Sequence, residues 1–414
     1  MKDTPANGSL TDSPQPGLLA RRRLKDALAL DDFERMARSF LPRPIFAYVA
    51  GASETGATFE DNRGVYSELA FLPKTLVSVT GRSTRTPLFD HEYDAPFGIS
   101  PIGLSALIAH RGDLALARSA AQANIPMIVS GASLIPMEEI AAAAPDAWFQ
   151  IYLPGEENVI LPMLNRVSAA GFRTLVLTVD MPVDSNREAS YRAGFSSPLR
   201  PSLRLAWDGM VRPEWIFGTF FRTIVQHGMP HFENGQVERG PSIVSRNVNH
   251  ALATRDHLNW DHFDLIRQHW NGRLIIKGIM TPGDARLAVD HGADAVMVSN
   301  HGGRQLDSLP APLRVLPAVA EAVAGRVPVL MDSGIRRGTD VLKALALGAD
   351  FVFTGRPFIY AAAIASEAGV GHAVKLLSEE VDRDMALLGI NRLEEMKPDL
   401  LMRISGPKFG YYGL

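Results

Sequence analysis

The chain contains no cysteine among its 414 residues. This absence excludes disulfide bonds, thiolate metal sites and a cysteine nucleophile, so any redox chemistry has to come from a cofactor. The net charge is only -3, whereas nucleic-acid-binding domains usually carry a basic patch or stripe. We therefore expect no nucleic-acid partner, assign no metal ligands and predict small-molecule chemistry.

The chain also has no long apolar run. No segment reaches the ~18 consecutive apolar residues of a membrane-spanning helix. Near the N-terminus, Lys25, Asp26, Asp31 and Asp32 interrupt the region in which a signal peptide would have its apolar stretch. We expect a cytoplasmic protein. Residues 1–20 are rich in Pro, Ser and Gly and are predicted to be a disordered leader.

From residue 97 onward, short apolar runs alternate with helical patterns. Segments such as RGDLALARSAAQAN and RRGTDVLKALALGA place apolar residues three and four apart, which is typical of helices. The alternation predicts a parallel sheet, and eight such units fit a closed (β/α)8 barrel, the TIM-barrel fold. The eight runs are FGISP, PMIVS, WFQIYL, TLVLTVD, LIIKG, AVMVSN, VPVLMDSG and FVFTG.

The predicted α/β protein has several parts. Residues 21–96 form a mostly helical N-terminal cap, residues 97–390 form the barrel, and residues 391–414 form a C-terminal tail. Residues 195–258 fit neither strand nor helix and are predicted to be an insertion after strand four. Barrels of this kind place their active sites at the carboxyl ends of the strands. The polar residues that end the eight runs should therefore meet at one mouth.

Three strand ends carry unusual side chains. SNHGGRQLD follows the sixth run and places His301 and Arg304 on either side of two glycines. DSGIRRGTDV follows the seventh run and opens a helix, and TGRP follows the eighth. Such barrels bind phosphate at these last two places, through backbone N–H groups and a helix N-terminus. Taken alone, however, the histidine also fits a structural residue and the glycines also fit tight turns.

These stretches resemble the FMN-dependent 2-hydroxy acid oxidases and dehydrogenases, a family that includes glycolate oxidase, lactate dehydrogenase and mandelate dehydrogenase. The resemblance runs from about Leu41, in LPRPIFAYVAGASETGATFEDN, to about Gly389, and the insertion breaks it. It implies FMN as the cofactor, a 2-hydroxy acid as the substrate and a homo-oligomer, a tetramer in the family. Other FMN-binding barrels, such as an isomerase or an inosinate-type dehydrogenase, would lack the HGGR chemistry. A flavin-binding protein without turnover is a further alternative.

The resemblance also implies the residues that contact FMN. Lys277 ends the apolar run LIIKG, where an unpaired lysine would be costly, and its implied role is to stabilise the reduced flavin. Asp332 is implied to hold the ribityl chain. The other implied contacts are Pro101, Ile102, Gly103, Ser130, Gln150, Thr178 and Ser299 near the ring, and Ser333, Gly334, Arg336, Gly355 and Arg356 toward the phosphate.

Oxidation of a 2-hydroxy acid needs a base, a cation for the carboxylate and close contact with the flavin. HGGR supplies all three, with His301 as the base, Arg304 as the carboxylate clamp and two glycines that keep the loop slim. The resemblance implies that Asp180 stabilises the imidazolium. It also implies that Arg187 is a second clamp, since a guanidinium can engage both carboxylate oxygens. Two tyrosines are implied to contact the carboxylate and the hydroxyl: Tyr48 and Tyr152.

Departures from the family pattern bear on the substrate. VDSN precedes Arg187 where many members place glycine, and PIG replaces the usual Pro-Thr-Ala, with Gly103 as in mandelate dehydrogenase. Ala132, in SGAS, occupies the position where glycolate oxidases, by resemblance, carry a tryptophan. We therefore expect an (S)-2-hydroxy acid larger than glycolate, either aromatic or long aliphatic, with lactate as an alternative.

The insertion contains the aromatic stretch RPEWIFGTFFRTIVQHG. Pro213 suits the first helical turn and glycine ends the run, so a helix over 213–227 is predicted with most of its apolar side chains on one broad face. This face either covers the barrel mouth as a lid or docks shallowly on a membrane, with Arg212 and Arg222 near the headgroups. The resemblance favours docking at the inner face of the cytoplasmic membrane and electron transfer to quinone or the respiratory chain. The alternative is an oxidase that uses oxygen and releases hydrogen peroxide.

Overall fold

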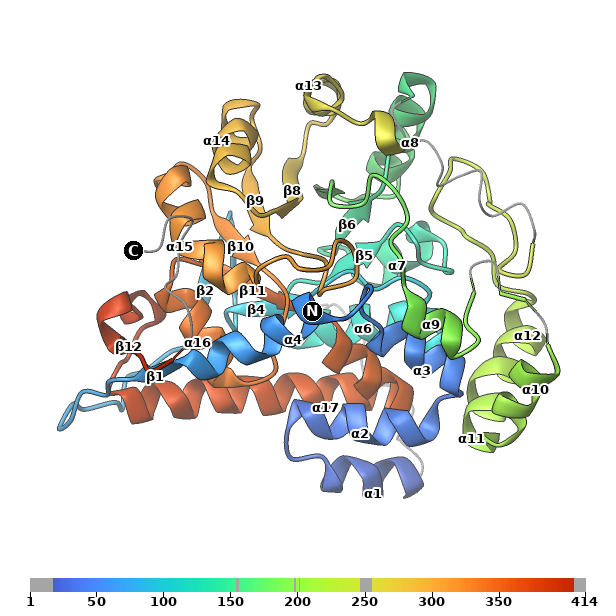
Figure 1. The fold of residues 1–414 in the computed structure, drawn as a ribbon, viewed down its shortest axis with the longest axis horizontal. Helices are drawn as coiled ribbons and strands as arrows, with labels where there is room; N and C mark the ends of the chain where they lie inside the picture. The colour runs from blue at the N-terminus through green and yellow to red at the C-terminus, as the bar shows by residue number, and fades with distance from the viewer. Residues whose placement is uncertain (1–17, 154–155, 197–198, 201, 246–254, 406–414) are drawn as a thin grey trace, which may run out of the picture.

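The protein is described by a computed structural model that covers residues 18–405 except 154–155, 197–198, 201 and 246–254. Eight parallel strands form one sheet in the order β4-β11-β10-β9-β8-β7-β6-β5 (Figure 1). A parallel bridge between Ile99 and Met127 joins its two edges. The predicted (β/α)8 barrel is confirmed, and each apolar run forms a strand. The strands are β4 (Phe97–Ile99), β5 (Ile128–Ser130), β6 (Trp148–Ile151), β7 (Thr174–Thr178), β8 (Arg273–Ile279), β9 (Ala295–Val298), β10 (Val329–Met331) and β11 (Phe351–Thr354).

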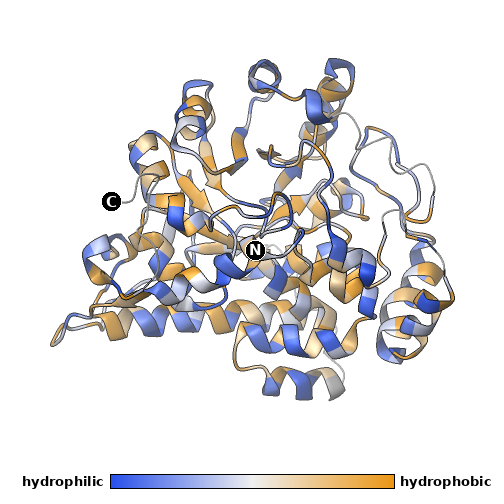
Figure 2. Cartoon of the chain, viewed as in Figure 1, coloured by the Kyte–Doolittle hydropathy of each residue, from blue (hydrophilic) through white to orange (hydrophobic). Residues whose placement is uncertain are grey.

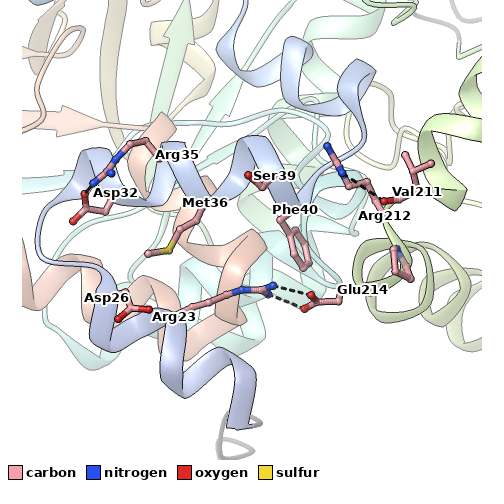
Figure 3. Close-up of a pocket in the computed structure, with 11 residues that line it drawn as sticks. Arg23, Asp26, Asp32, Arg35, Met36, Ser39, Phe40, Val211, Arg212 and Glu214 are labelled. Carbon is pink, nitrogen blue, oxygen red and sulfur yellow. Dashed lines mark hydrogen bonds and ion pairs between the residues drawn. The ribbon is translucent and has the colours of Figure 1, made fainter.

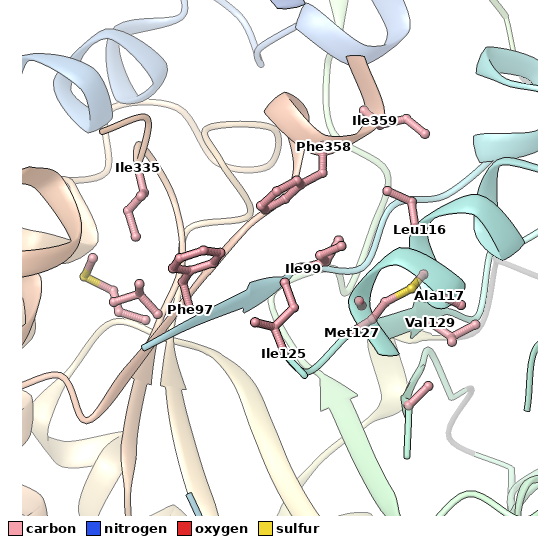
Figure 4. Close-up of a cluster of buried hydrophobic side chains, with 14 of the residues drawn as sticks. Phe97, Ile99, Leu116, Ala117, Ile125, Met127, Val129, Ile335, Phe358 and Ile359 are labelled. Atoms are coloured by element: carbon pink, nitrogen blue, oxygen red, sulfur yellow. The ribbon is translucent and has the colours of Figure 1, made fainter. Parts of the chain in front are cut away.

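Two apolar layers stabilise the barrel. Successive strand residues point to opposite faces, so Val176 lies in the barrel interior while Leu175 and Leu177 pack under the outer helices. Because both faces are covered, the strands read as nearly continuous apolar runs, and Figure 2 shows them as the hydrophobic centre of the molecule. Figure 4 shows part of the outer layer, where strand and helix side chains meet: Phe97, Val129, Leu116 and Phe358.

The outer helices begin where the local sequence caps them. Asn259 accepts a hydrogen bond from the backbone N–H of His262 at the start of α13, and Thr281 does the same from Asp284 at the start of α14. Pro282 follows Thr281 at the first helical position, where a missing N–H costs nothing. The outer helices are α6 (Gly112–Gln122), α7 (Met137–Ala143), α8 (Glu157–Ala169), α13 (Trp260–His269), α14 (Pro282–Asp290), α15 (Pro312–Val323), α16 (Gly338–Ala346) and α17 (Arg356–Leu388).

The chain before the barrel is helical only in its first part. It begins with α1 (Leu18–Asp26), α2 (Leu30–Phe40), α3 (Arg43–Ala50), α4 (Ala57–Gly64) and the short turn η1 (Val65–Glu68). The rest contains the strands β1 (Leu69–Phe71), β2 (Thr86–Leu88) and β3 (His91–Tyr93). Helix α2 packs on α17. The β2–β3 hairpin packs Phe89 and Tyr93 against Trp148 and Phe351, at the amino ends of the barrel strands.

The segment after α17 packs back on the cap. It contains the turns η5 (Leu393–Glu395) and η6 (Pro398–Leu400) and the strand β12 (Leu401–Arg403). Strand β12 pairs antiparallel with β1, so that Leu69 lies opposite Arg403. The predicted tail is therefore joined to the predicted cap by a small sheet. Most of the predicted leader lies outside the described residues, and Leu18–Ala20 belong to α1.

The insertion follows β7, the fourth barrel strand. It contains α10 (Leu203–Met210) and one helical run made of α11 (Pro213–Trp215), the π-helical turn η2 (Ile216–Phe221) and α12 (Arg222–His227). The extent predicted for this helix is confirmed, but the single apolar face is wrong. Trp215, Thr219 and Thr223 are buried, whereas Phe217, Phe221 and Val225 are exposed. Residues four apart share one side of a helix, whereas residues two apart lie on nearly opposite sides, so the apolar side chains divide between a buried and an exposed side.

Candidate active site

The carboxyl ends of the strands surround a cavity of about 330 Å³. Gln150, Thr178, Asp180 and Ser299 lie directly behind its wall as buried or nearly buried residues. The other predicted site residues line the cavity itself: Tyr48, Pro101, Ile102, Gly103, Ser130, Tyr152, Arg187, Lys277, His301, Arg304, Asp332, Ser333, Gly334, Arg336, Gly355 and Arg356. The structure thus brings all of these residues to one mouth.

A second cavity, of about 580 Å³, lies between α1, α2 and the start of α11 (Figure 3). Arg23 and Glu214 face each other there through two hydrogen bonds of 2.7 Å and neutralise each other. The described residues that line this cavity include no histidine and no tyrosine. We therefore place the candidate site at the barrel mouth.

His301 lies between an acid and a phenol. Its Nδ1 is 2.9 Å from Oδ1 of Asp180, and its Nε2 is 3.5 Å from the Tyr152 hydroxyl. The three residues follow β9, β7 and β6, which is why the barrel brings them together. The carboxylate favours the proton on Nδ1, so Nε2 keeps its lone pair on the Tyr152 side.

The electrostatics suit a base. Burial lowers the pKa of His301, and Lys277 and Arg187 add to this against the raising effect of Asp180. The imidazole is therefore neutral near pH 7 and able to take a proton. Burial by itself would raise the pKa of Asp180, but His301 and Lys277 outweigh it, so the pKa is lowered and the group stays ionised. Burial also raises the pKa of Tyr152, which keeps its hydroxyl protonated.

The loop that carries His301 needs its two glycines. His301, Gly302 and Gly303 have φ values of 57°, 66° and 74°, a conformation that costs glycine little and other residues more. A Cβ on Gly302 would lie 2.8 Å from Nη1 of Arg356, and one on Gly303 would lie 2.8 Å from Cα of Phe59 in α4. The glycines therefore allow a left-handed turn packed tightly against the cap. This turn brings both His301 and Arg304 to the cavity.

Arg304 and Arg187 place two guanidinium groups in this cavity. Nη1 of Arg304 donates to the backbone carbonyls of Tyr48 and Gly51, at 2.7 and 3.1 Å, near the end of α3. Nε of Arg187 donates to Oγ of Ser185 at 3.0 Å. Burial, with Arg187 nearby, lowers the pKa of Arg304 to about 9, which leaves it charged at pH 7. Neither arginine forms an ion pair with a described residue, so both can bind an anion.

Several buried polar atoms behind the cavity lack partners among the described residues, and Oδ2 of Asp180 is one of them. Oε1 of Gln150 accepts hydrogen bonds from Ser130 and Gly131, each at 3.3 Å. In the described part of the chain, however, Nε2 of Gln150 and Oγ1 of Thr178 have no partner. Strand register places Ser130 beside Gln150 and Lys277 beside Thr178. Because buried polar atoms are normally hydrogen-bonded, this row of groups indicates a polar ligand.

Lys277 is buried, and its charge is balanced by Asp332. Its Nζ lies 3.0 Å from Oδ2 of Asp332 and donates to Oγ of Ser299 at 2.6 Å. The hydroxyls of Ser100 and Ser333 also donate to Asp332, at 3.4 and 2.9 Å. The ends of β4, β8, β9 and β10 thus meet in one polar cluster that holds a positive charge at the mouth.

The predicted phosphate residues follow β10 and β11. Arg336 is buried just before the N-terminus of α16. Gly334 has a φ of 88°, and a Cβ there would lie 2.0 Å from the carbonyl oxygen of Asn62, so contact with α4 requires this glycine. Arg356 donates to three backbone carbonyls at 2.9, 3.1 and 3.0 Å and so joins α3 to the histidine loop; they belong to Val49, Gly51 and Gly302.

The insertion supplies cavity residues that the sequence does not reveal, among them Phe195, Phe232 and Arg255. Asn234 fixes part of this wall to the barrel, because it accepts from the backbone of Met137 at 2.9 Å and donates to that of Ile135 at 2.8 Å. No strand end or motif marks these positions, so periodicity cannot find them. One part of the insertion thus lines the cavity, while its helices lie outside it.

Comparison with known proteins identifies the family. The family described as FMN-dependent dehydrogenase matches residues 37–403. An L-lactate dehydrogenase of Ectopseudomonas mendocina (strain ymp) is 38% identical over 379 residues, which cover 91% of this chain and 98% of that protein. The chain belongs to the FMN-dependent 2-hydroxy acid dehydrogenases.

Two solved structures are similar to this dehydrogenase. One is the monotopic membrane protein (S)-mandelate dehydrogenase, with a TM-score of 0.82 and 33% identity over 92% of this chain and 100% of that one. The other is a mandelate oxidase with (S)-2-phenylpropionate, with a TM-score of 0.75 and 33% identity over 92% of this chain and 99% of that one. The relatives thus include both a dehydrogenase and an oxidase.

FMN is the cofactor of this dehydrogenase, and the site fits it. The unpartnered polar atoms of Gln150 and Thr178 match the need of a flavin ring for hydrogen bonds at its pyrimidine edge. Lys277 supplies a positive charge for the reduced ring, and the N-terminus of α16 with Arg336 suits a phosphate. Both ends of the cofactor therefore have suitable groups in one cavity.

Proposed function

We propose that this dehydrogenase oxidises an (S)-2-hydroxy acid larger than glycolate to the 2-oxo acid and passes the electrons to a quinone or the respiratory chain. The observation that carries the proposal is that Nδ1 of His301 lies 2.9 Å from Asp180, in one cavity with the guanidinium groups of Arg187 and Arg304. This set offers a base and an anion clamp next to the groups that suit FMN.

Each residue then has a defined part. Bound FMN supplies the acceptor for the two electrons that leave C2 of the substrate. Arg187 and Arg304 bind the carboxylate. The oxidation removes two hydrogens, one from C2 and one from the hydroxyl: Nε2 of His301 takes one of them as a proton, and the other would leave with the two electrons to the flavin. Asp180 stabilises the imidazolium so formed. We assign the substrate hydroxyl to Tyr152, whose own hydroxyl faces His301, and the carboxylate to Tyr48, whose ring lies 5.0 Å from Cζ of Arg304.

The proposed flavin contacts follow the same geometry. Ser130, Gln150 and Thr178 hydrogen-bond to the ring, and the backbone of 101–103 lies beside it. Lys277 stabilises the reduced ring and Asp332 holds the ribityl chain. Arg336 and the N-terminus of α16 bind the phosphate. Arg356 connects α3 to the loop that carries His301 through hydrogen bonds. The protein is also proposed to be a homo-oligomer, on the family resemblance alone.

Anaerobic addition of a 2-hydroxy acid to the holoenzyme tests the proposed function. The bound flavin should bleach, because substrate oxidation reduces it. A yellow protein that no 2-hydroxy acid bleaches would instead be a flavin-binding protein without turnover. Bleaching by other donors alone would favour a different FMN-dependent enzyme.

The size of the substrate pocket depends on Ala132. A Cβ on Gly103 would lie 3.0 Å from Cβ of Ala132 and 3.2 Å from the Tyr48 hydroxyl, so both small residues open the same corner of the cavity. We expect Ala132→Trp to lower kcat/KM for (S)-mandelate relative to glycolate by roughly 10- to 200-fold. Flavin reduction over a substrate panel measures the ratio. If glycolate already has the highest kcat/KM with the unmodified enzyme, the size assignment is wrong.

The outer surface of the insertion supports membrane docking. Its exposed apolar residues form what we call the insertion surface: Leu203, Trp207, Met210, Val211, Phe217, Phe221, Val225 and Met229. None of the described helices is long and apolar enough to span a bilayer. A shallow contact with the interface would cover such a surface, and a similar structure is that of a monotopic membrane protein. Arg212 does not fit the predicted headgroup role, since its Nε donates to the carbonyl of Leu41 at 3.3 Å.

Changing Phe217, Phe221 and Val225 together to serine should release the protein from membranes. Fully buried apolar side chains contribute roughly 1.5–3 kcal/mol each, so vesicle binding should weaken by at least about 10²-fold. Flavin reduction should persist, because these residues do not line the cavity. A matched control changes the exposed Leu287 and Leu387 of α14 and α17 to serine. An intact protein that stays soluble and turns over rapidly with oxygen would be an oxidase.

A further inference from the structure

Arg255 is a third arginine in the substrate cavity. It lies at the start of the turn η4 (Arg255–His257), lines the cavity and is only 7% exposed. Its Cζ lies 4.8 Å from the centroid of the Tyr152 ring. Its one polar contact within the described chain is a long one, 4.0 Å from Nη1 to Sδ of Met181.

The charge of Arg255 has no ion-pair partner among the residues that the structure describes. Other charged groups at this mouth have protein partners: Lys277 forms an ion pair with Asp332 at 3.0 Å, and Asp180 accepts a hydrogen bond from His301 at 2.9 Å. No described carboxylate forms an ion pair with Arg255, and Asp184, which raises its pKa, is exposed at the rim. The segment that precedes it, RNVNHALAT, contains no acidic residue.

A buried guanidinium without an anion is costly, because burial removes its hydration and a single aromatic ring replaces little of it. Burial lowers the pKa of Arg255, while Tyr152 and Asp184 raise it. The carboxylate of a 2-hydroxy acid is already served by Arg187 and Arg304. Another part of the bound molecule can therefore supply the anion for Arg255.

We infer that Arg255 binds a second anionic group on the substrate, so that the preferred substrates are 2-hydroxy dicarboxylic acids. This inference rests on the proposed function and specifies its substrate class. The Tyr152 hydroxyl lies 3.5 Å from His301, and the guanidinium of Arg255 lies over the same ring. The Tyr152 side chain thus contacts His301, where the substrate reacts, through its hydroxyl and Arg255 through its ring. The small Ala132 and Gly103 leave room in the same cavity.

A matched pair of ligands tests the inference by binding. 2-Oxoglutarate and 2-oxopentanoate have the same five-carbon chain and differ in the distal carboxylate. The absorbance change of the oxidised flavin in the holoenzyme gives both dissociation constants. We expect 2-oxoglutarate to bind about 10- to 100-fold more tightly, the range of one charge-assisted hydrogen bond. In Arg255→Met this advantage should disappear, and in Arg255→Lys part of it should remain.

Steady-state kinetics distinguish two roles of Arg255: direct contact with the substrate, and positioning of Tyr152. For Arg255→Met, kcat/KM for (S)-2-hydroxyglutarate should fall about 10- to 100-fold, while that for (S)-2-hydroxypentanoate stays within about twofold. Equal losses for both substrates, with unchanged FMN content, would make Arg255 a positioning residue for Tyr152 and overturn the inference. Tighter binding of 2-oxopentanoate by the unmodified enzyme would also overturn it.

A control lies in the insertion itself. Arg239 is ion-paired with Glu233 at 2.8 Å and does not line the cavity, so Arg239→Met should change neither ratio. Different outcomes contradict the proposed function and the assignment of Arg255. If neither substrate of the pair, nor any other 2-hydroxy acid, reduces the flavin, then the proposed function itself fails. If monocarboxylic acids reduce it efficiently and Arg255→Met has no selective effect, only the assignment of Arg255 fails.

Discussion

His301→Gln is expected to retain FMN and to lower the rate of flavin reduction by substrate about 10²- to 10⁴-fold, the contribution of a positioned general base. Glutamine has no group that can take a proton near pH 7. The proposed flavin contacts lie on other strand ends, so the visible spectrum and FMN content should not change. Rapid anaerobic mixing of the 2-hydroxy acid with the oxidised enzyme measures the rate of flavin reduction directly.

The chain offers a matched control for this variant. His291 forms a similar pair, with Nδ1 at 2.6 Å from Oδ1 of Asp264, in the outer helical layer. His291→Gln removes an imidazole from an aspartate without touching the cavity, and it should reduce normally. Near-normal flavin reduction in His301→Gln would remove the histidine from the mechanism and leave the identity of the base open.

Gly303→Ala is expected to destabilise the holoenzyme by roughly 2–5 kcal/mol, from left-handed strain together with overpacking. Its φ is 74°, and the new Cβ would lie 2.8 Å from backbone atoms of Phe59. The loop has to shift to relieve this contact, and the shift moves His301 and Arg304. A displacement of about 1 Å at a reacting group costs on the order of 10²-fold in rate. Urea unfolding and flavin reduction measure the two effects.

Gly325→Ala separates the two causes. Gly325 has a similar φ, 68°, but a Cβ there would meet no atom within 4 Å. This control should lose roughly 1–2 kcal/mol of stability, from the left-handed strain alone, and should keep its activity. If Gly303→Ala is no less stable than Gly325→Ala and reduces its flavin at the normal rate, the tight packing of the loop against α4 contributes to neither stability nor activity.

The barrel and much of the site were predictable because local patterns specify them. Runs such as TLVLTVD are apolar on both faces, which a covered parallel strand requires, and the residues after each run lie at the carboxyl mouth by topology alone. These residues are far apart in sequence, yet His301 and Asp180 follow strands and Lys277 lies near the carboxyl end of β8. Their convergence therefore follows from counting strands. The resemblance to a known family then supplied the roles.

Other features depend on contacts between distant segments, and the sequence does not reveal them. Position 334 has to be glycine because a Cβ there would clash with the carbonyl of Asn62. The guanidinium of Arg356 donates to backbone carbonyls of α3 and of the loop that carries His301. Which side of the helical run 213–227 is buried depends on how the run packs against the rest of the protein. Arg255 enters the cavity from the end of the insertion, where no pattern marks it. The sequence by itself determined the barrel and the strand-end residues, because strand period and order are local properties. Only the tertiary structure decided which charges in the cavity have a protein partner, because pairing depends on the packing of segments that the sequence keeps apart.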